Sequence, residues 1–223
     1  MSLDAGNMPG PAVQAFETTI FQDLTVYQPW KDWAPSRVSH HGAMCCEIAR
    51  EWIIDTDFSV LNGANSLTGP RWLRQRFEWG PGVYPLHWCE VPKKTALDCG
   101  ILAALSYELF TQRGVRAFRA QLVQEFADSA SAHWRSAWED DSAITAWIDG
   151  KVIYHEGCAV VGRSNEIKLW DSSAGWWVDP KTTSGYGSIL ALKITAHEDI
   201  PDLMWGHHRL SANRWIELGD TYD

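Results

Sequence analysis

Long apolar runs and basic charge are both scarce in this sequence. No stretch of about 18 consecutive apolar residues occurs, so we expect no helix that spans a membrane. The 19 lysines and arginines are outnumbered by 28 aspartates and glutamates, and the formal net charge is −9. An acidic protein repels a phosphate backbone, which argues against a nucleic-acid partner. The first residues lack the basic and apolar regions of a signal peptide, so a cytoplasmic location is expected.

Cysteine pairs are also missing. The sequence contains no CxxC pair, and a chain of 223 residues does not depend on disulfides for its stability, so reduced thiols are expected. The segment 40–46 holds two histidines and two cysteines, but it would offer ligands from one helix face only, whereas structural zinc needs a full tetrahedral set. No glycine-rich phosphate loop is present. We therefore expect neither a metal nor a cofactor. The cysteines are Cys45, Cys46, Cys89, Cys99 and Cys158.

Tryptophan, by contrast, is over-represented. The chain has 14 tryptophans, spread from Trp30 to Trp215 instead of forming a motif. We interpret them as a tryptophan-rich core with half-buried rings at its margin; a substrate groove lined by rings is the alternative. Neither an internal repeat nor a low-complexity linker divides the chain, so a single domain over residues 1–223 is predicted, with residues 1–12 as a loose tail.

The first half of the chain is predicted to be mainly helical. Ser39 is a candidate N-cap for a helix that ends near Trp52, and a short helical piece is expected at 70–77. The stretch 79–94, WGPGVYPLHWCEVPKK, is rich in proline and glycine and is expected to be irregular. The small, polar and acidic segment 125–141 favours a surface helix or a mobile flap.

The most regular helical pattern lies in TALDCGILAALSYELFTQRGV, residues 95–115. Asp98, or Thr95 one turn earlier, is a candidate N-cap, apolar residues recur at intervals of three and four, and Gly114 marks the end. Cys99 therefore falls in the first turn, where unpaired N–H groups and the peptide dipoles favour a thiolate. An inert, buried cysteine is the alternative interpretation.

The second half is predicted to be sheet. VRAFRAQLVQ alternates as a strand, with Phe118, Ala120 and Leu122 on one face. The Asp149-Gly150 dipeptide favours a two-residue type I′ hairpin within AITAWIDGKVIYHEGCAVV. EIKLWD and SILALKI are further strands, and SSAGWW is a turn between them. Helices followed by an antiparallel meander indicate an α+β fold.

Strand alternation also predicts a polar pair on an apolar face. If the residues GRS form a three-residue loop that closes Val161 onto Asn165, His155 lies directly opposite Asp171. Opposed Cβ atoms are about 5 Å apart, close enough for a carboxylate to hold an imidazole. We therefore hypothesise that Asp171 orients His155 and that His155 activates Cys99 as a nucleophile. A buried His–Asp hydrogen bond with no catalytic role is the alternative.

The segments DCGILAALSYELFTQRGVRAF, YHEGCAVV and IKLWDSS together resemble the transglutaminase-like branch of the papain-like cysteine enzymes. The resemblance covers about eighty residues. It implies a papain-like fold in which the nucleophile opens a central helix packed on an antiparallel sheet. It also implies Cys99 as nucleophile, His155 as general base and then acid, and Asp171 as the residue that orients the imidazole.

The sequence departs from the family pattern in two places. Glu156 follows the catalytic histidine where the family has a His-Ala-Trp run, and a serine, not proline, follows Asp171. An Asp-Pro dipeptide occurs later, so Asp179 is a rival third member of the triad. His87 and Trp88 are candidates for the side chain that completes the oxyanion hole.

The resemblance implies acyl transfer on a peptide, amide, ester or acyl-thioester substrate. The acyl group would pass to water, as in a peptidase, or to an amine, as in a transglutaminase-like transamidation. Two alternatives remain open. One is a biosynthetic acyltransferase that takes its acyl group from a carrier, and the other is a catalytically silent, tryptophan-rich binding domain.

Overall fold

The computed structural model describes a mixed helical and sheet structure whose core is predominantly sheet, in agreement with the predicted α+β class. The predicted helix at 39–52, the segment 126–141 and the tail at 1–12 lie outside the described residues. Of the predicted 70–77 helix, Arg76 and Phe77 are described, and Arg76 is helical. The described residues are 27–28, 30–31, 33–35, 76–80, 88–112, 114–125, 147–162, 167–178 and 188–200.

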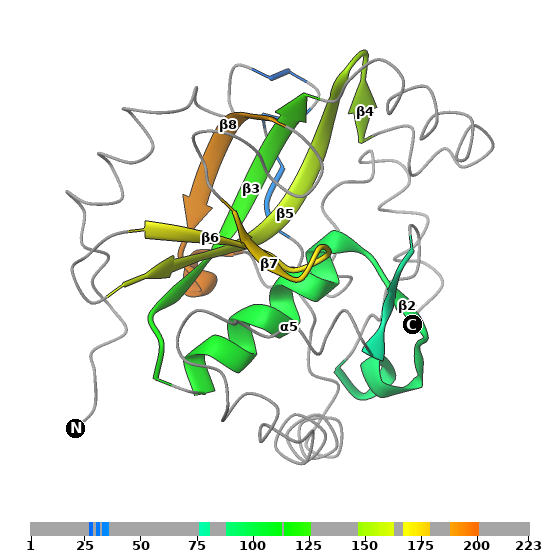
Figure 1. Cartoon of the computed structure of the whole chain (residues 1–223), viewed down its shortest axis with the longest axis vertical. Helices are drawn as coiled ribbons and strands as arrows, with labels where there is room; N and C mark the ends of the chain where they lie inside the picture. Colours follow the sequence, from blue (N-terminus) through cyan, green and yellow to red (C-terminus); the bar gives the residue numbers. More distant parts are fainter. Residues whose placement is uncertain are drawn as a thin grey trace.

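Six strands form the main sheet. Five of them follow the order β7-β6-β5-β3-β8, and β4 pairs with the start of β5 (Figure 1). All pairings in this sheet are antiparallel, and the run from β4 to β7 is the predicted meander. The last strand does not extend that meander, because β8 pairs with β3 at the opposite edge. The bounds are β3 Ala117–Glu125, β4 Ile148–Asp149, β5 Val152–Val161, β6 Ile167–Asp171, β7 Trp176–Val178 and β8 Ser188–Thr195.

The predicted hairpin at the Asp-Gly dipeptide forms between β4 and β5. Asp149 pairs with Val152, so the two-residue loop consists of Gly150 and Lys151. Gly150 has a φ of +62°, a conformation that glycine adopts without a steric penalty. The loop therefore begins one residue later than the dipeptide suggests.

Helix α5 spans Cys99–Gln112, as the sequence predicts. Asp98 is its N-cap, because the Ile101 N–H donates to Asp98 Oδ1 at 2.8 Å. At the other end Gly114, with φ of +69°, donates to the Thr111 carbonyl at 2.9 Å. The next residue, Val115, donates back to Phe110 at 3.0 Å, which completes a Schellman motif. Both ends of this helix are thus set by local backbone chemistry.

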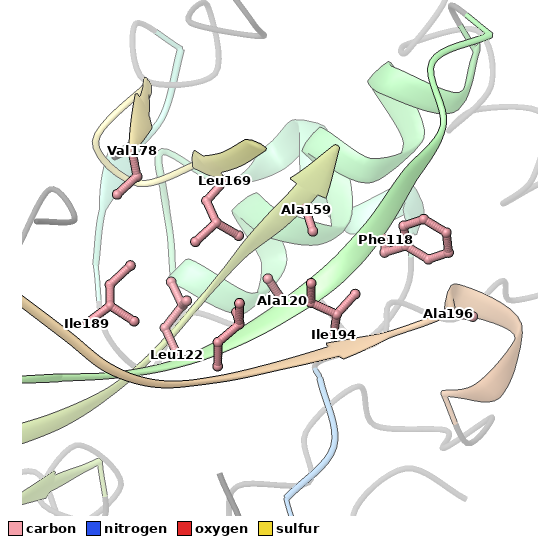
Figure 2. Close-up of a cluster of buried hydrophobic side chains, with 10 residues drawn as sticks. Phe118, Ala120, Leu122, Ala159, Leu169, Val178, Ile189, Ile194 and Ala196 are labelled. Carbon is pink, nitrogen blue, oxygen red and sulfur yellow. The ribbon is translucent and has the colours of Figure 1, made fainter. Parts of the chain in front are cut away.

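The two faces of the sheet bury different clusters. On one face, Ala103 and Phe110 of α5 pack against Cys158, Val160 and Trp170. On the other face, ten buried residues from the strands and the turn after β8 form an apolar cluster (Figure 2). The three predicted members of β3 all belong to this second cluster. It consists of Phe118, Ala120, Leu122, Ala159, Leu169, Val178, Ile189, Leu192, Ile194 and Ala196.

The approach to α5 is more regular than predicted. Strand β1 (Glu78–Trp79) pairs in parallel with β2 (Ala96–Leu97), and a 3₁₀ helix, η2 (Trp88–Lys93), lies between them in sequence. The expectation of an irregular segment was wrong for these residues. Pro92 lies inside η2, which is possible because the φ of proline is within the range of a 3₁₀ helix.

The register between β5 and β6 differs from the predicted one by two residues. Val161 pairs with Ile167 instead of Asn165, so five residues, not three, separate the paired ends. Ala159 lies opposite Leu169, and both belong to the apolar cluster of Figure 2. A shift of two keeps every side chain on its predicted face, whereas a shift of one would reverse them all. Continued by one pair, the register places Asp171 opposite Gly157.

Gly157 is required by the close approach of β6. A Cβ atom at this position would lie 2.6 Å from the Trp170 carbonyl oxygen, which belongs to backbone and cannot rotate away. We expect Gly157→Ala to lower the free energy of unfolding by about 1–3 kcal/mol, measured by urea denaturation. Gly114→Ala is a control without a collision, because nothing lies within 4 Å of its Cβ and only its φ of +69° is strained. A Gly157→Ala protein as stable as the wild type would contradict the close strand contact.

Candidate catalytic site

Cys99 is the first residue of α5. The N–H groups of Ile101 and Leu102 donate to the side chain and the backbone carbonyl of Asp98, at 2.8 and 3.0 Å. The thiol side chain is buried, with 1% of the residue exposed. The structure thus places this cysteine at the electropositive end of the helix, as the sequence predicts.

His155 and Asp171 are in contact across neighbouring strands. The imidazole Nε2 lies 3.2 Å from Asp171 Oδ1, and both side chains are buried. The predicted contact is present, but the two residues are not directly opposed. They form a diagonal pair, and the residue opposite Asp171 is Gly157, which has no side chain to separate them. The predicted register was wrong and the predicted pair was right.

The Asp171 carboxylate is held by the turn that follows it. Its Oδ1 accepts hydrogen bonds from the N–H groups of Ser173 and Ala174, each at 3.0 Å. The Gly175 N–H donates to the Asp171 carbonyl at 2.8 Å and closes the turn between β6 and β7. These backbone donors therefore orient the carboxylate independently of the imidazole. The predicted SSAGWW turn is confirmed in its first four residues, whereas its tryptophans belong to β7.

The His155 imidazole also contacts the nucleophile candidate, through a side-chain hydrogen bond with Cys99. Burial by itself lowers the pKa of this imidazole, but the negative charge and hydrogen bond of Asp171, together with Cys99, outweigh it. The pKa of His155 is raised from 6.5 to about 10. The ring is therefore an imidazolium at neutral pH. Because Nε2 is bonded to Asp171, Nδ1 is the ring nitrogen that can exchange a proton with the Cys99 thiol.

The structure thus brings together the three predicted residues, Cys99, His155 and Asp171, from the start of a helix and from two strands. The rival aspartate, Asp179, and one oxyanion candidate, His87, lie outside the described residues. The other oxyanion candidate, Trp88, begins η2, and its side chain is not among those described.

Of the six tryptophans whose burial is described, three lie in the core and three, Trp33, Trp79 and Trp177, are half-buried. Trp30, Trp147 and Trp170 are each at most 1% exposed. Trp30 packs on Tyr154, with ring centroids 6.1 Å apart, and Trp170 packs edge-on against Trp177 at 5.1 Å. For these residues the interpretation as a tryptophan-rich core is confirmed.

A buried ion pair beside the site was not predicted from the sequence. Arg119 of β3 and Glu156 of β5 are both fully buried, and Arg119 Nη2 lies 3.0 Å from Glu156 Oε2. The same Nη2 donates to the carbonyl of Gly100, also at 3.0 Å. Glu156, which follows His155 in the sequence, is therefore connected through Arg119 to the start of α5.

The network continues away from the helix through two further side chains. The Tyr154 hydroxyl donates to Glu156 Oε1 at 3.0 Å, and Gln121 Nε2 donates to that hydroxyl at 2.8 Å. The Gln121 amide also reaches the Trp33 carbonyl at 2.9 Å. The signal in the sequence is a polar residue at every second position of two adjacent strands. In a half-exposed strand those positions face water. Here the start of α5 covers Arg119, while Trp30 and Trp33 pack on Tyr154.

Comparison of the chain with protein-family models, with curated proteins and with solved structures found no match. The functional interpretation therefore depends on the arrangement of the site residues themselves. Among the residues that the structure describes, no helix has the length and apolar character needed to cross a membrane. In the same part of the chain, no group of three or more histidine, cysteine, aspartate or glutamate side chains is placed to hold a metal ion.

Replacing Asp171 should deprive His155 of its charge. In Asp171→Asn the burial of the ring is no longer opposed by a carboxylate, so its pKa should fall from about 10 to 6.5 or below. Because the folded-state pKa in the wild type is raised, the contact stabilises the fold fully below pH 6.5, and this stabilisation is lost as the pH rises towards 10. NMR titration of the ring measures the pKa, and urea denaturation across this range measures the stability. A histidine that titrates near 6.5 in both proteins would contradict the contact.

Proposed function

We propose that the protein is a thiol-dependent acyl-transfer enzyme with Cys99 as nucleophile, His155 as acid and base, and Asp171 as the residue that orients the imidazole. The observation that carries the proposal is the double contact of one buried ring. His155 is hydrogen-bonded to Asp171 on one side and to Cys99 on the other, and its raised pKa keeps it protonated. An imidazolium beside a thiol stabilises the thiolate, which is the reactive form.

In the first half-reaction the Cys99 thiolate attacks the carbonyl carbon of the substrate and forms a C–S bond. The carbonyl oxygen becomes an oxyanion, which the backbone N–H of Cys99 would stabilise together with one further donor. The intermediate then collapses and expels the leaving amine, alcohol or thiol, which takes its proton from the His155 imidazolium. The products are a thioester on Cys99 and a neutral imidazole.

The second half-reaction releases the acyl group. The neutral His155 ring accepts a proton from the incoming water or amine, which attacks the thioester carbonyl. Collapse of this second intermediate breaks the C–S bond and returns the thiolate and the imidazolium. Throughout the cycle Asp171 holds Nε2 and balances the positive charge of the ring, and its own backbone donors keep it in place.

The fold we propose for the chain is papain-like, of the transglutaminase-like kind. Three features support it: the cysteine opens a helix, that helix packs on an antiparallel sheet, and the histidine and aspartate come from adjacent strands of that sheet. The substrates that this chemistry accepts are a peptide, an amide, an ester or an acyl-thioester, including an acyl group supplied by a carrier. The alternative of a silent binding domain receives less support, since Trp30, Trp147 and Trp170 are buried and cannot contribute to a recognition surface.

Selective alkylation of Cys99 tests the proposal. Cys158 is a matched internal control, because it is as buried as Cys99 and burial raises the pKa of its thiol to about 12. With iodoacetamide at about pH 6.5, Cys99 should react well before Cys158, and His155→Ala should slow its reaction by about a hundredfold. Peptide mapping by mass spectrometry measures the rate at each cysteine.

The two thiols differ in their surroundings and not in access, so unequal rates report the chemistry of the site. Cys158 donates its S–H to the Ala103 carbonyl at 3.1 Å, and no histidine of the described residues contributes to the pKa of its thiol. If Cys99 reacts no faster than Cys158, or if His155→Ala reacts at the wild-type rate, the enzymatic proposal fails and the silent domain is favoured.

Trapping the acyl-enzyme distinguishes hydrolysis from transfer. An activated ester should acylate Cys99 in the wild type and not in Cys99→Ala, and intact-protein mass spectrometry follows the bound acyl group. The decay is then measured in buffer alone and with added primary amines. A peptidase should release the acyl group in buffer, whereas a transferase should retain it until an amine is supplied. Absence of acylation in the wild type would contradict both forms of the proposal.

A further inference from the structure

We infer that Arg119 and Glu156 act as positioning residues, which hold the helix that carries the nucleophile against the strand that carries the base. This inference rests on the proposed function and adds to it a connection between two parts of the site. A single guanidinium nitrogen, Arg119 Nη2, lies 3.0 Å from the Gly100 carbonyl and 3.0 Å from Glu156 Oε2.

Both contacts are adjacent in sequence to the catalytic candidates. Gly100 follows Cys99 in the first turn of α5, and Glu156 follows His155 in β5. Each bond therefore fixes the backbone one residue away from a reacting side chain. Neighbouring side chains of a strand point to opposite faces, so Glu156 can hold its strand while leaving the imidazole of His155 to face Asp171 and Cys99.

Glu156 is in turn fixed from its other oxygen. Tyr154 donates to Oε1, while Arg119 binds Oε2, so both neighbours of His155 belong to the same buried network. Gln121 fixes the tyrosine hydroxyl and continues to the Trp33 carbonyl. Each of these four side chains hydrogen-bonds another member of the network, and Arg119 joins the network to the start of α5. Such a network restricts the distance between the sulfur and the ring.

Desolvating two charges is costly, and apolar residues of similar size often replace a buried ion pair with no loss of stability. The connection between helix and strand, however, would be lost with the pair. The double variant Arg119→Met/Glu156→Met removes both charges together and leaves no charge unpaired in the core. It therefore separates positioning from stability.

The test is the pH profile of Cys99 alkylation in folded protein, checked by circular dichroism and urea denaturation. In the double variant we expect the rate below pH 7 to fall by about tenfold or more and the profile to move towards that of an ordinary thiol, because misplaced reacting groups lose most of their mutual activation. Glu156→Gln, which keeps the shape but loosens the guanidinium, should change the profile in the same direction by a smaller factor. If the double variant does not fold, this single variant decides the test.

Val160→Ala is the matched control, because Val160 is buried on the same strand and the same face but has no bond to the start of α5. It should lower stability and leave the profile unchanged. A wild-type profile in the folded double variant, or in Glu156→Gln when that variant decides, would overturn the positioning role. An equal change in Val160→Ala would also overturn it. If Cys99 of the wild type is no more reactive than an ordinary thiol, the proposed function itself fails. If Cys99 of the wild type is reactive and the variants react at the same rate, only the positioning role fails.

Discussion

The hydrogen bond between His155 and Asp171 is the interaction on which the candidate site depends, and it exists because β5 and β6 approach each other closely. The approach is possible only where a side chain is missing, at Gly157, whose Cα faces the Trp170 carbonyl. The diagonal arrangement that results gives the imidazole room to contact both the carboxylate and the thiol. The charge of the ring follows from the same contact, since a buried imidazole without a carboxylate partner would be neutral.

Much of this arrangement was predictable from local patterns. The limits of α5 were readable because Asp98 and Gly114 act on the backbone within one turn of themselves. The contact of His155 with Asp171 was predicted from a loop of the wrong length. The prediction was still correct because only the parity of the register decides which face a side chain occupies. The correct register depends on how Leu169 packs in the cluster of Figure 2, which is a tertiary property that loop composition does not encode.

The buried polar network was missed for a different reason. Alternation along a strand predicts that polar positions face water, and that rule assumes nothing covers the second face. Here α5 covers it, and Arg119 is neutralised by Glu156, a residue far away in sequence on the adjacent strand. The position of β8 was missed similarly, because the local pattern of neither strand specifies that β8 pairs with β3. Sequence patterns thus located Cys99, His155 and Asp171 better than they located the side chains that surround them.

The pairing of β8 with β3 has a consequence for biosynthesis. Cys99, His155 and Asp171 all leave the ribosome before residues 188–195, which form the strand that completes the sheet beside β3. Until that strand arrives, β3 presents an unpaired edge, and nascent chains with such an edge are prone to join one another. The side chains of Cys99, His155 and Asp171 are therefore synthesised before the strand that pairs with the second edge of β3.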